Sequence, residues 1–202
     1  MLLKGERRQR FERLPPNVLA YNLKNGIPFP DQSVDVVYHS HVLEHIERDL
    51  VPGFLREVFR VLRRGGIHRI VVPDLEVLCR RYVENLEIAS GDPEARARHD
   101  LFIGSMFEQC VRRHPGATRG MSPHRRFIHE LLFGDARRRG ETHQWMYDRV
   151  NLSHLLEEAG FTNVRIVGPR ESRVPQWDLL NLDVDESGGP RKPHSLYVEA
   201  ER

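Results

Sequence analysis

The chain has 202 residues, of which 39% are hydrophobic and 30% charged, as expected for one soluble globular domain with a buried core. A formal net charge of +2 argues against the strong basic field of nucleic-acid-binding proteins. Two cysteines are too few for a disulfide framework or a structural zinc site, which favours a reducing cytoplasm. No apolar run has the length of a membrane span, and no signal-peptide segment is recognisable.

The N-terminal segment is basic and short of apolar residues. Residues 1–14 include Lys4 and four arginines, which predicts a solvated arm or a short surface helix. Pro15 and Pro16 end this segment because proline cannot donate a helical hydrogen bond. The residues Val18–Leu23 that follow predict a short strand.

The segment from Ile27 to Ile46 combines a turn, a strand and a polar end. Two prolines with Asp31 and Ser33 predict the turn. The β-branched and aromatic run from Val34 to Tyr38 predicts a strand covered on both faces. Its carboxyl end carries a group of polar residues, namely His39, Ser40, His41, Glu44 and His45. Ligands bind at this end of open α/β sheets, so we expect a site here.

Helices and strands then alternate. Apolar residues at helical spacing predict a helix over residues 50–62, which Gly65 and Gly66 are expected to end. Residues 67–72 predict a second buried strand, and residues 75–86 another helix. This alternation indicates a parallel sheet with right-handed crossovers.

Residues 85–144 interrupt the alternation. The interruption contains predicted helices over 101–111 and 127–133, separated by a basic loop over 114–126. Insertions of this length in a compact domain are commonly functional. The loop carries Arg119, Arg125, Arg126, His114 and His124. It is interpreted as solvated surface or as a phosphate or carboxylate site, and not as a nucleic-acid groove.

The C-terminal part returns to regular structure. Asn151 is a candidate N-cap for a helix over 152–159 that ends at Gly160. Residues 161–167 predict a strand. Residues 195–200 predict another, whose alternation of polar and apolar side chains is typical of an antiparallel edge strand.

Several of these segments resemble class I methyltransferases that use S-adenosylmethionine. Residues 34–45 resemble the family's fourth strand with its "s-H-v-L-E-H" loop, and Leu62–Asp74 resembles the "RVLkpGG" element and fifth strand. Leu155–Phe161 resembles the "LL-eaGF" segment before the sixth strand, and residues 195–200 resemble the seventh. The resemblance therefore extends from Val18 to Ala200.

The resemblance implies a fold class and a domain organisation. It implies an α/β, Rossmann-like methyltransferase core with a mostly parallel sheet and a C-terminal antiparallel hairpin. Residues 1–202 would form a single domain, with residues 85–144 as a helical lid over the acceptor. The family's strand order is 3-2-1-4-5-7-6.

The family's glycine-rich loop and the acidic end of its second strand have no counterpart before Val18. We therefore expect a core that is incomplete on its N-terminal side, either as a truncated product or as a natural remnant. The strand over 34–40 would then lie at an edge of the sheet, and an uncovered apolar edge promotes aggregation. Val18–Leu23 is expected to pair beside it, or a homodimer to cover it.

The resemblance also assigns roles to residues. S-adenosylmethionine would be the methyl donor, and the acceptor a small molecule or glycan. The cofactor-binding candidates are Asn22, Leu23, His39, Ser40 and His41. His41 and His45 are the candidate general bases, because imidazole titrates near neutral pH; alternatively, the loop residues only cap and orient the loop. His143, Trp145 and Tyr147 would line an acceptor pocket, or else form a core aromatic cluster.

Two other functions are considered. His41-Val-Leu-Glu-His45 matches H-x-x-E-H, the inverted zinc-protease motif, which needs a helix and a third ligand such as Glu130 or Glu157. A buried strand leads directly into the motif, so no metal is expected. The second alternative is a methyltransferase-like remnant without cofactor binding that acts as a binding or assembly module.

Overall fold

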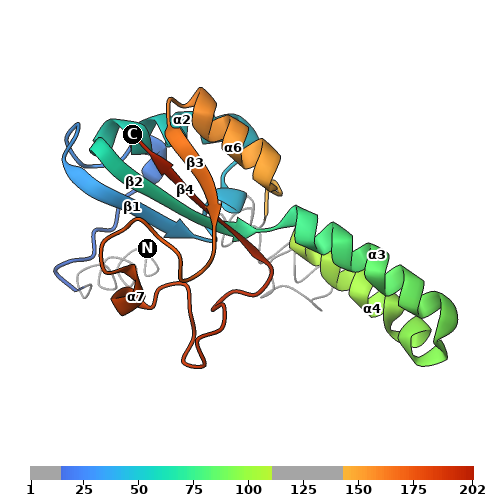
Figure 1. Ribbon diagram of the computed structural model, residues 1–202. Helices are drawn as coiled ribbons and strands as arrows, with labels where there is room; N and C mark the ends of the chain where they lie inside the picture. The colour runs from blue at the N-terminus through green and yellow to red at the C-terminus, as the bar shows by residue number, and fades with distance from the viewer. Residues whose placement is uncertain (1–14, 111–142) are drawn as a thin grey trace, which may run out of the picture.

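The computed structural model describes residues 15–110 and 143–202. The predictions for the basic arm over 1–14, the basic loop over 114–126, the helix over 127–133 and Glu130 lie outside these residues. The described chain is built around a four-stranded sheet (Figure 1). Its strands are β1 (Val34–Ser40), β2 (Leu62–Pro73), β3 (Thr162–Val167) and β4 (Ser195–Glu201).

The strands lie in the order β1-β2-β4-β3. β1 is parallel to β2, whereas β4 is antiparallel to both β2 and β3. This order and these directions match the 4-5-7-6 part of the expected methyltransferase sheet, so the Rossmann-like fold class is confirmed. The prediction of an edge strand over 195–200 is wrong, because β4 lies inside the sheet and five of its seven residues are buried.

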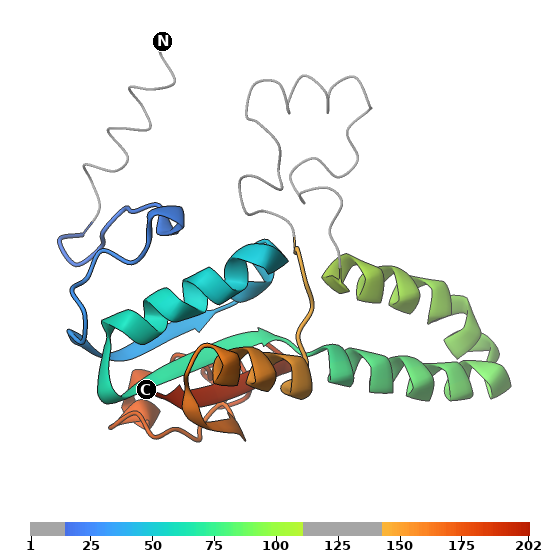
Figure 2. The same ribbon diagram turned by 90° about the horizontal axis from the view of Figure 1, so that it is seen from above.

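Two helices cover one face of the sheet. α2 (Val51–Val61) and α6 (Arg149–Glu158) lie over the strands when the molecule is viewed from above (Figure 2). The apolar side of α2 buries Val51, Leu55, Val58 and Val61. The first three of these side chains pack in one core with residues of the sheet and of α6, which include Ile70, Val72, Leu152, Leu156, Phe161 and Val198.

α2 ends earlier than the glycines of its sequence suggest. Leu62 already has extended backbone angles, so Gly65 and Gly66 lie within β2. The register between β1 and β2 shifts there, from Val34 opposite Leu62 to Val36 opposite Ile67. A Cβ at residue 66 would lie 2.8 Å from the Arg63 carbonyl oxygen. Gly66 is therefore required by close backbone approach.

The start of α6 also differs from the prediction. The N-cap is Asp148, whose carboxylate accepts hydrogen bonds from the Val150 and Asn151 backbone N–H groups. Asn151 lies three residues inside, and its side chain accepts from the Asp148 N–H to complete a capping box. Asp148 satisfies the N-cap preference equally well and extends the helix by one turn.

The first part of the insertion is a helical hairpin. α3 (Leu75–Gly91) begins at Asp74, whose side chain caps the Glu76 and Val77 N–H groups. α4 (Pro93–Cys110) runs back along α3, and the pair projects away from the sheet in both views (Figures 1 and 2). Among the described helices, none combines the length and apolar character needed to cross a membrane.

The predicted strand over Val18–Leu23 is absent. The segment is irregular and leads into the 3-10 helix η1 (Leu23–Asn25). Val18, Leu19 and Tyr21 are each about half exposed, at 48%, 64% and 45%. The prediction that this segment pairs beside β1 is therefore wrong, and within residues 15–110 and 143–202 no strand pairs with the outer edge of β1.

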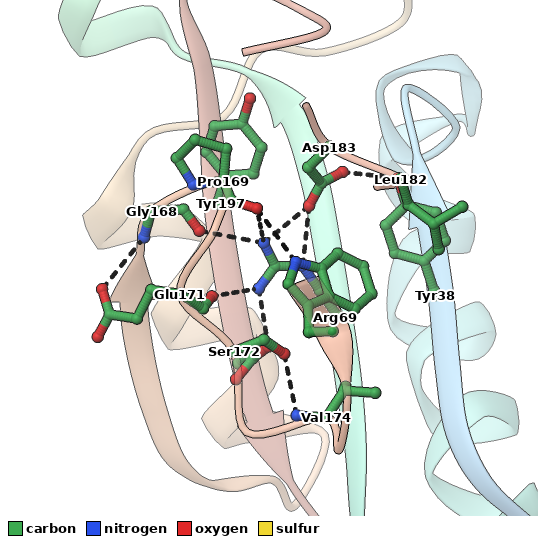
Figure 3. Close-up of polar contacts among 12 residues, drawn as sticks. Tyr38, Arg69, Gly168, Pro169, Glu171, Ser172, Val174, Leu182, Asp183 and Tyr197 are labelled. Atoms are coloured by element: carbon green, nitrogen blue, oxygen red, sulfur yellow. Dashed lines mark hydrogen bonds and ion pairs between the residues drawn. The ribbon is translucent and has the colours of Figure 1, made fainter. Parts of the chain in front are cut away.

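The opposite face of the sheet is covered by the connection between β3 and β4, which contains the short helix α7 (Trp177–Leu180). At its centre the fully buried Arg69 side chain forms ion pairs with Asp183 and Glu199, at 2.7 Å each (Figure 3). Its remaining hydrogen bonds go to the backbone oxygens of Gly168, Pro169 and Glu171. The Trp177 ring lies 4.2 Å from the guanidinium carbon. We call these residues the Arg69 cluster.

Candidate active site

The candidate site lies where β1 and β2 end and β4 begins. His41 follows β1 with a left-handed φ of 54°, and its backbone N–H donates to the Val71 carbonyl. Its ring then connects two segments: Nε2 is 3.0 Å from Ser195 Oγ, and Nδ1 is 3.2 Å from Glu44 Oε1. His41 thus joins the end of β1 to the start of β4 across β2.

Glu44 is the most deeply buried charged residue of the site. It lies in the 3-10 helix η2 (Leu43–His45), and its exposed fraction is 0%. Within residues 15–110 and 143–202, neither carboxylate oxygen has a hydrogen-bond partner, although His41 Nδ1 at 3.2 Å and His45 Nε2 at 3.9 Å are at ion-pair distance from Oε1. Burying a carboxylate without hydrogen bonds costs free energy, because the group loses its contacts with water.

The last residues of the insertion pack against η2. The Gln144 backbone N–H donates to the Glu44 carbonyl oxygen at 2.6 Å. The buried His143 ring lies edge-on to the His45 ring, with centroids 4.9 Å apart. Residues expected separately as a general base and as part of the acceptor pocket are therefore in contact.

Trp145 and Tyr147 flank one arginine. The Arg48 guanidinium lies over both rings, 5.2 Å from the Trp145 centroid and 5.8 Å from that of Tyr147. Trp145 is 43% exposed, so a ligand can reach its ring. Tyr147 is fully buried, and burial raises its pKa to about 12. Trp145 fits an acceptor surface, whereas Tyr147 fits the aromatic-core interpretation. Sequence reasoning did not identify Arg48 as a member of this group.

His39 occupies a core position. Its Nε2 lies 3.0 Å from Nε2 of the fully buried His68, and its ring packs edge-on against Phe54. Burial lowers the pKa of His39 to about 4 and holds that of His68 well below its usual range, so both rings are neutral at pH 7. His39 therefore faces the helix-covered core and not the pocket beside Ser40.

Ser40 lies on the other face and lines a pocket of about 440 Å³. The pocket is bounded by the ends of β1 and β2, by β4 and by the segment before β4. Its lining residues are Tyr38, Ser40, Val71, Leu180, Asn181, Leu182, Asp183, Arg191, Lys192 and Tyr197. The Tyr38 hydroxyl donates to Asp183 at 2.7 Å; burial and this bond raise the Tyr38 pKa to about 12. The segment 180–192 was not expected to take part in a site. This segment lies in the connection from β3 to β4 and contains no recognisable sequence motif, so its polar residues did not indicate a site.

Asn22 and Leu23 are exposed residues in and before η1, and neither lines this pocket. The structure does not bring them together with Ser40 and His41, which were expected to hold the same ligand. Their proposed contact with an adenine depended on a strand that is not formed.

The H-x-x-E-H motif does not form the arrangement of a zinc protease. His41 has left-handed backbone angles, and the residues that follow form only a 3-10 turn over 43–45. The two histidines consequently do not project from one face of an α-helix, as such enzymes require. The zinc-protease interpretation is wrong.

Comparison with known proteins supports the resemblance. Residues 2–70 match the family model described as a methyltransferase domain. This match agrees with the resemblance to methyltransferases that the motifs indicate, for the part of the chain that carries β1 and most of β2. A search among proteins of curated function finds no significant match.

Solved structures of methyltransferases are also similar to the chain. A structure from Mesorhizobium loti is 16% identical with a TM-score of 0.43, and the match covers 98% of this chain and 76% of that one. Structures from Methanosarcina mazei and Archaeoglobus fulgidus are each 15% identical, with TM-scores of 0.42 and 0.40 over 88% and 89% of this chain. The chain spans 63% of the length of each of these two. Such TM-scores do not establish a fold, which rests here on strand order and the family match.

Proposed function

We propose that this protein transfers a methyl group from S-adenosylmethionine to a small-molecule or glycan-type acceptor. The observation that carries the proposal is the pocket of about 440 Å³ that Ser40 lines at the carboxyl end of β1, with His41 as the next residue of the chain. The family match includes this strand and its loop. Ligands of open α/β sheets bind at such strand ends.

The pocket fits a small ligand in size and chemistry. Its volume lies within the range of about 300–1,000 Å³ that is common for small-molecule sites. Ser40 supplies a hydroxyl, Lys192 a cation and Tyr197 an aromatic face. When bound, S-adenosylmethionine supplies an electrophilic methyl group on a sulfonium. The protein's task is then mainly to align the acceptor atom with that methyl group.

His45 is the better placed general base of the two candidates. Its side chain is 28% exposed, so an acceptor can reach the ring, and its Nε2 lies 3.9 Å from the Glu44 carboxylate. His41 is instead held between Glu44 and Ser195 and orients the loop. Trp145 offers the acceptor an exposed ring. The α3–α4 hairpin belongs, in this proposal, to a lid formed by residues 85–144.

The edge of β1 supports a second candidate function. Its outer side carries no strand partner within the described residues, and strand edges pair readily with other chains. A methyltransferase-like module that assembles through β1, as a homodimer or with another protein, fits this observation. Binding of the cofactor product distinguishes the two proposals.

The test is calorimetric titration of the 202-residue chain with S-adenosylhomocysteine. We expect micromolar binding, and at least about tenfold weaker binding by Ser40→Tyr, whose ring fills the pocket end. His154→Tyr on the exposed side of α6 is the control and is expected to bind normally. No binding at millimolar ligand refutes the transferase proposal. Sedimentation of the same samples then tests the homodimer form of the assembly proposal, which a monomer at all concentrations refutes.

A further inference from the structure

A mixed histidine–carboxylate cluster lies beyond the end of β1. A metal bound there would take the lone pair of His45 and so exclude its role as a general base. One ligand atom from each of Glu44, His45 and His143 lies within 4.8 Å of the other two. Glu44 and His143 are buried, and His45 is half-buried. Glu44 and His45 lie in η2, whereas His143 lies at the far end of the insertion, so no local turn explains their convergence.

The buried carboxylate of Glu44 is the independent sign of a ligand. Its side chain is completely buried, yet neither oxygen accepts a hydrogen bond. An ionised carboxylate in such a place needs a cation or several donors to offset the loss of water. The surrounding groups are imidazoles, which are metal ligands in their neutral form. A metal ion would satisfy the carboxylate and both rings simultaneously.

The position of His41 supports the same interpretation. Its Nδ1 is 3.2 Å from Glu44 Oε1, and its Nε2 is 3.0 Å from the Ser195 hydroxyl. Ligating carboxylates are commonly oriented by such a neighbour outside the ligand set. The backbone bond from Gln144 to the Glu44 carbonyl holds the two ligand segments side by side.

We propose that Glu44, His45 and His143 bind a divalent first-row transition metal, for which zinc is the best match. Two imidazoles and one carboxylate are a typical three-residue zinc set, and three protein ligands leave a coordination position for water or an acceptor oxygen. The metal would fasten the loop after β1 to the end of the insertion. This site differs from the rejected protease motif, because His143 and not His41 is the partner of His45.

The experiment uses the full chain, stripped of metal with a chelator and dialysed. Zinc is titrated in competition with a chromogenic chelator, and bound metal is counted by elemental analysis. We expect one zinc per chain. His143→Ala and His45→Ala should each weaken zinc binding by at least about 100-fold, as loss of a direct ligand exceeds the 10–100-fold effect of outer-shell partners.

The matched control is His154→Ala. His154 lies 3.5 Å from Glu158 on α6, so it is another histidine beside a glutamate, but both side chains are more than 60% exposed. This variant should bind zinc as the wild type does. Circular dichroism of each metal-free variant shows whether it folds, and Co²⁺ absorption of the wild type reports the ligand geometry.

Two outcomes overturn the proposal. One is the absence of stoichiometric zinc binding by the folded wild-type chain. The other is equal zinc affinity in His143→Ala, His45→Ala and His154→Ala, which would indicate surface binding only. Neither outcome depends on S-adenosylhomocysteine binding. The zinc titration therefore tests the metal site independently of the proposed methyltransferase function.

Discussion

The two polar clusters buried in this protein differ in how completely they are satisfied. In the Arg69 cluster, two carboxylates and several carbonyl oxygens accept hydrogen bonds from the one guanidinium. In the cluster around Glu44, the carboxylate is equally buried but accepts no hydrogen bond. Buried polar groups that are fully paired fix a structure, whereas an unpaired one needs a ligand to explain it.

The location of the clusters fits this difference. The Arg69 cluster fastens the irregular segment 168–183 to the sheet, where few backbone bonds of regular structure are available. The Glu44 cluster lies next to the end of β1, where ligands of such sheets bind. The Arg69 cluster thus stabilises the fold, whereas the Glu44 cluster is positioned to bind a ligand.

Removing Arg69 should have the largest effect on stability. Arg69→Met leaves the carboxylates of Asp183 and Glu199 buried without their cation, and breaking such a pair typically costs about 3–5 kcal/mol. Urea unfolding measures the loss. Arg63→Met is the control, because its pair with Asp35 is exposed on both sides and should contribute less than about 1 kcal/mol. Equal losses in both variants would contradict the comparison.

Acid should destabilise the protein through a third buried group, the neutral His39–His68 pair. The folded-state pKa of His39, about 4, lies below its ordinary value of 6.5 because of burial. As the pH falls, His39 is therefore protonated in the unfolded chain before it is protonated in the folded chain. The contribution of this group to the free energy of unfolding is complete above pH 6.5 and is lost as the pH falls towards 4. For His39 the loss is about 3 kcal/mol.

Urea unfolding at pH 7 and pH 4 measures this loss, and His39→Phe should reduce it. The exposed His154→Gln should leave the pH dependence unchanged. A stability that does not change between pH 7 and pH 4 would show that the two imidazoles are not buried as a neutral pair.

Neutralising Glu44 should have the smallest effect and the opposite sign. In metal-free protein, Glu44→Gln removes a buried charge without a hydrogen bond, so the free energy of unfolding should rise by about 1 kcal/mol. Urea unfolding with and without zinc checks this. Zinc should stabilise the wild type and not the variant. A clear loss of stability in metal-free Glu44→Gln would show that the carboxylate is already paired, as in the Arg69 cluster.

Much of the fold could be predicted because its signals are local. The apolar run before Ser40, the helical spacing from Leu50 and the strand after Gly66 all identify elements that the structure contains. Val18–Leu23 has similar residues but no partner strand, so its side chains remain exposed. Strand propensity depends on pairing, and a sequence pattern alone does not provide it.

The site was predictable only in part. His41 and His45 follow a recognisable strand, but their contact with Glu44 and His143 depends on how a distant segment returns to η2. The Arg69 cluster gave a weak signal, a charged residue in the middle of a buried strand. Its partners Asp183 and Glu199 lie more than a hundred residues away.

The internal position of β4 has a consequence for synthesis on the ribosome. β4 is the last of the four strands in chain order, yet it separates β2 from β3 and pairs with both. β2 and β3 cannot complete their hydrogen bonds until β4 has left the exit tunnel. Non-local pairing of this kind slows folding and exposes strand edges meanwhile. The nascent chain is therefore expected to depend on chaperones until its final strand emerges.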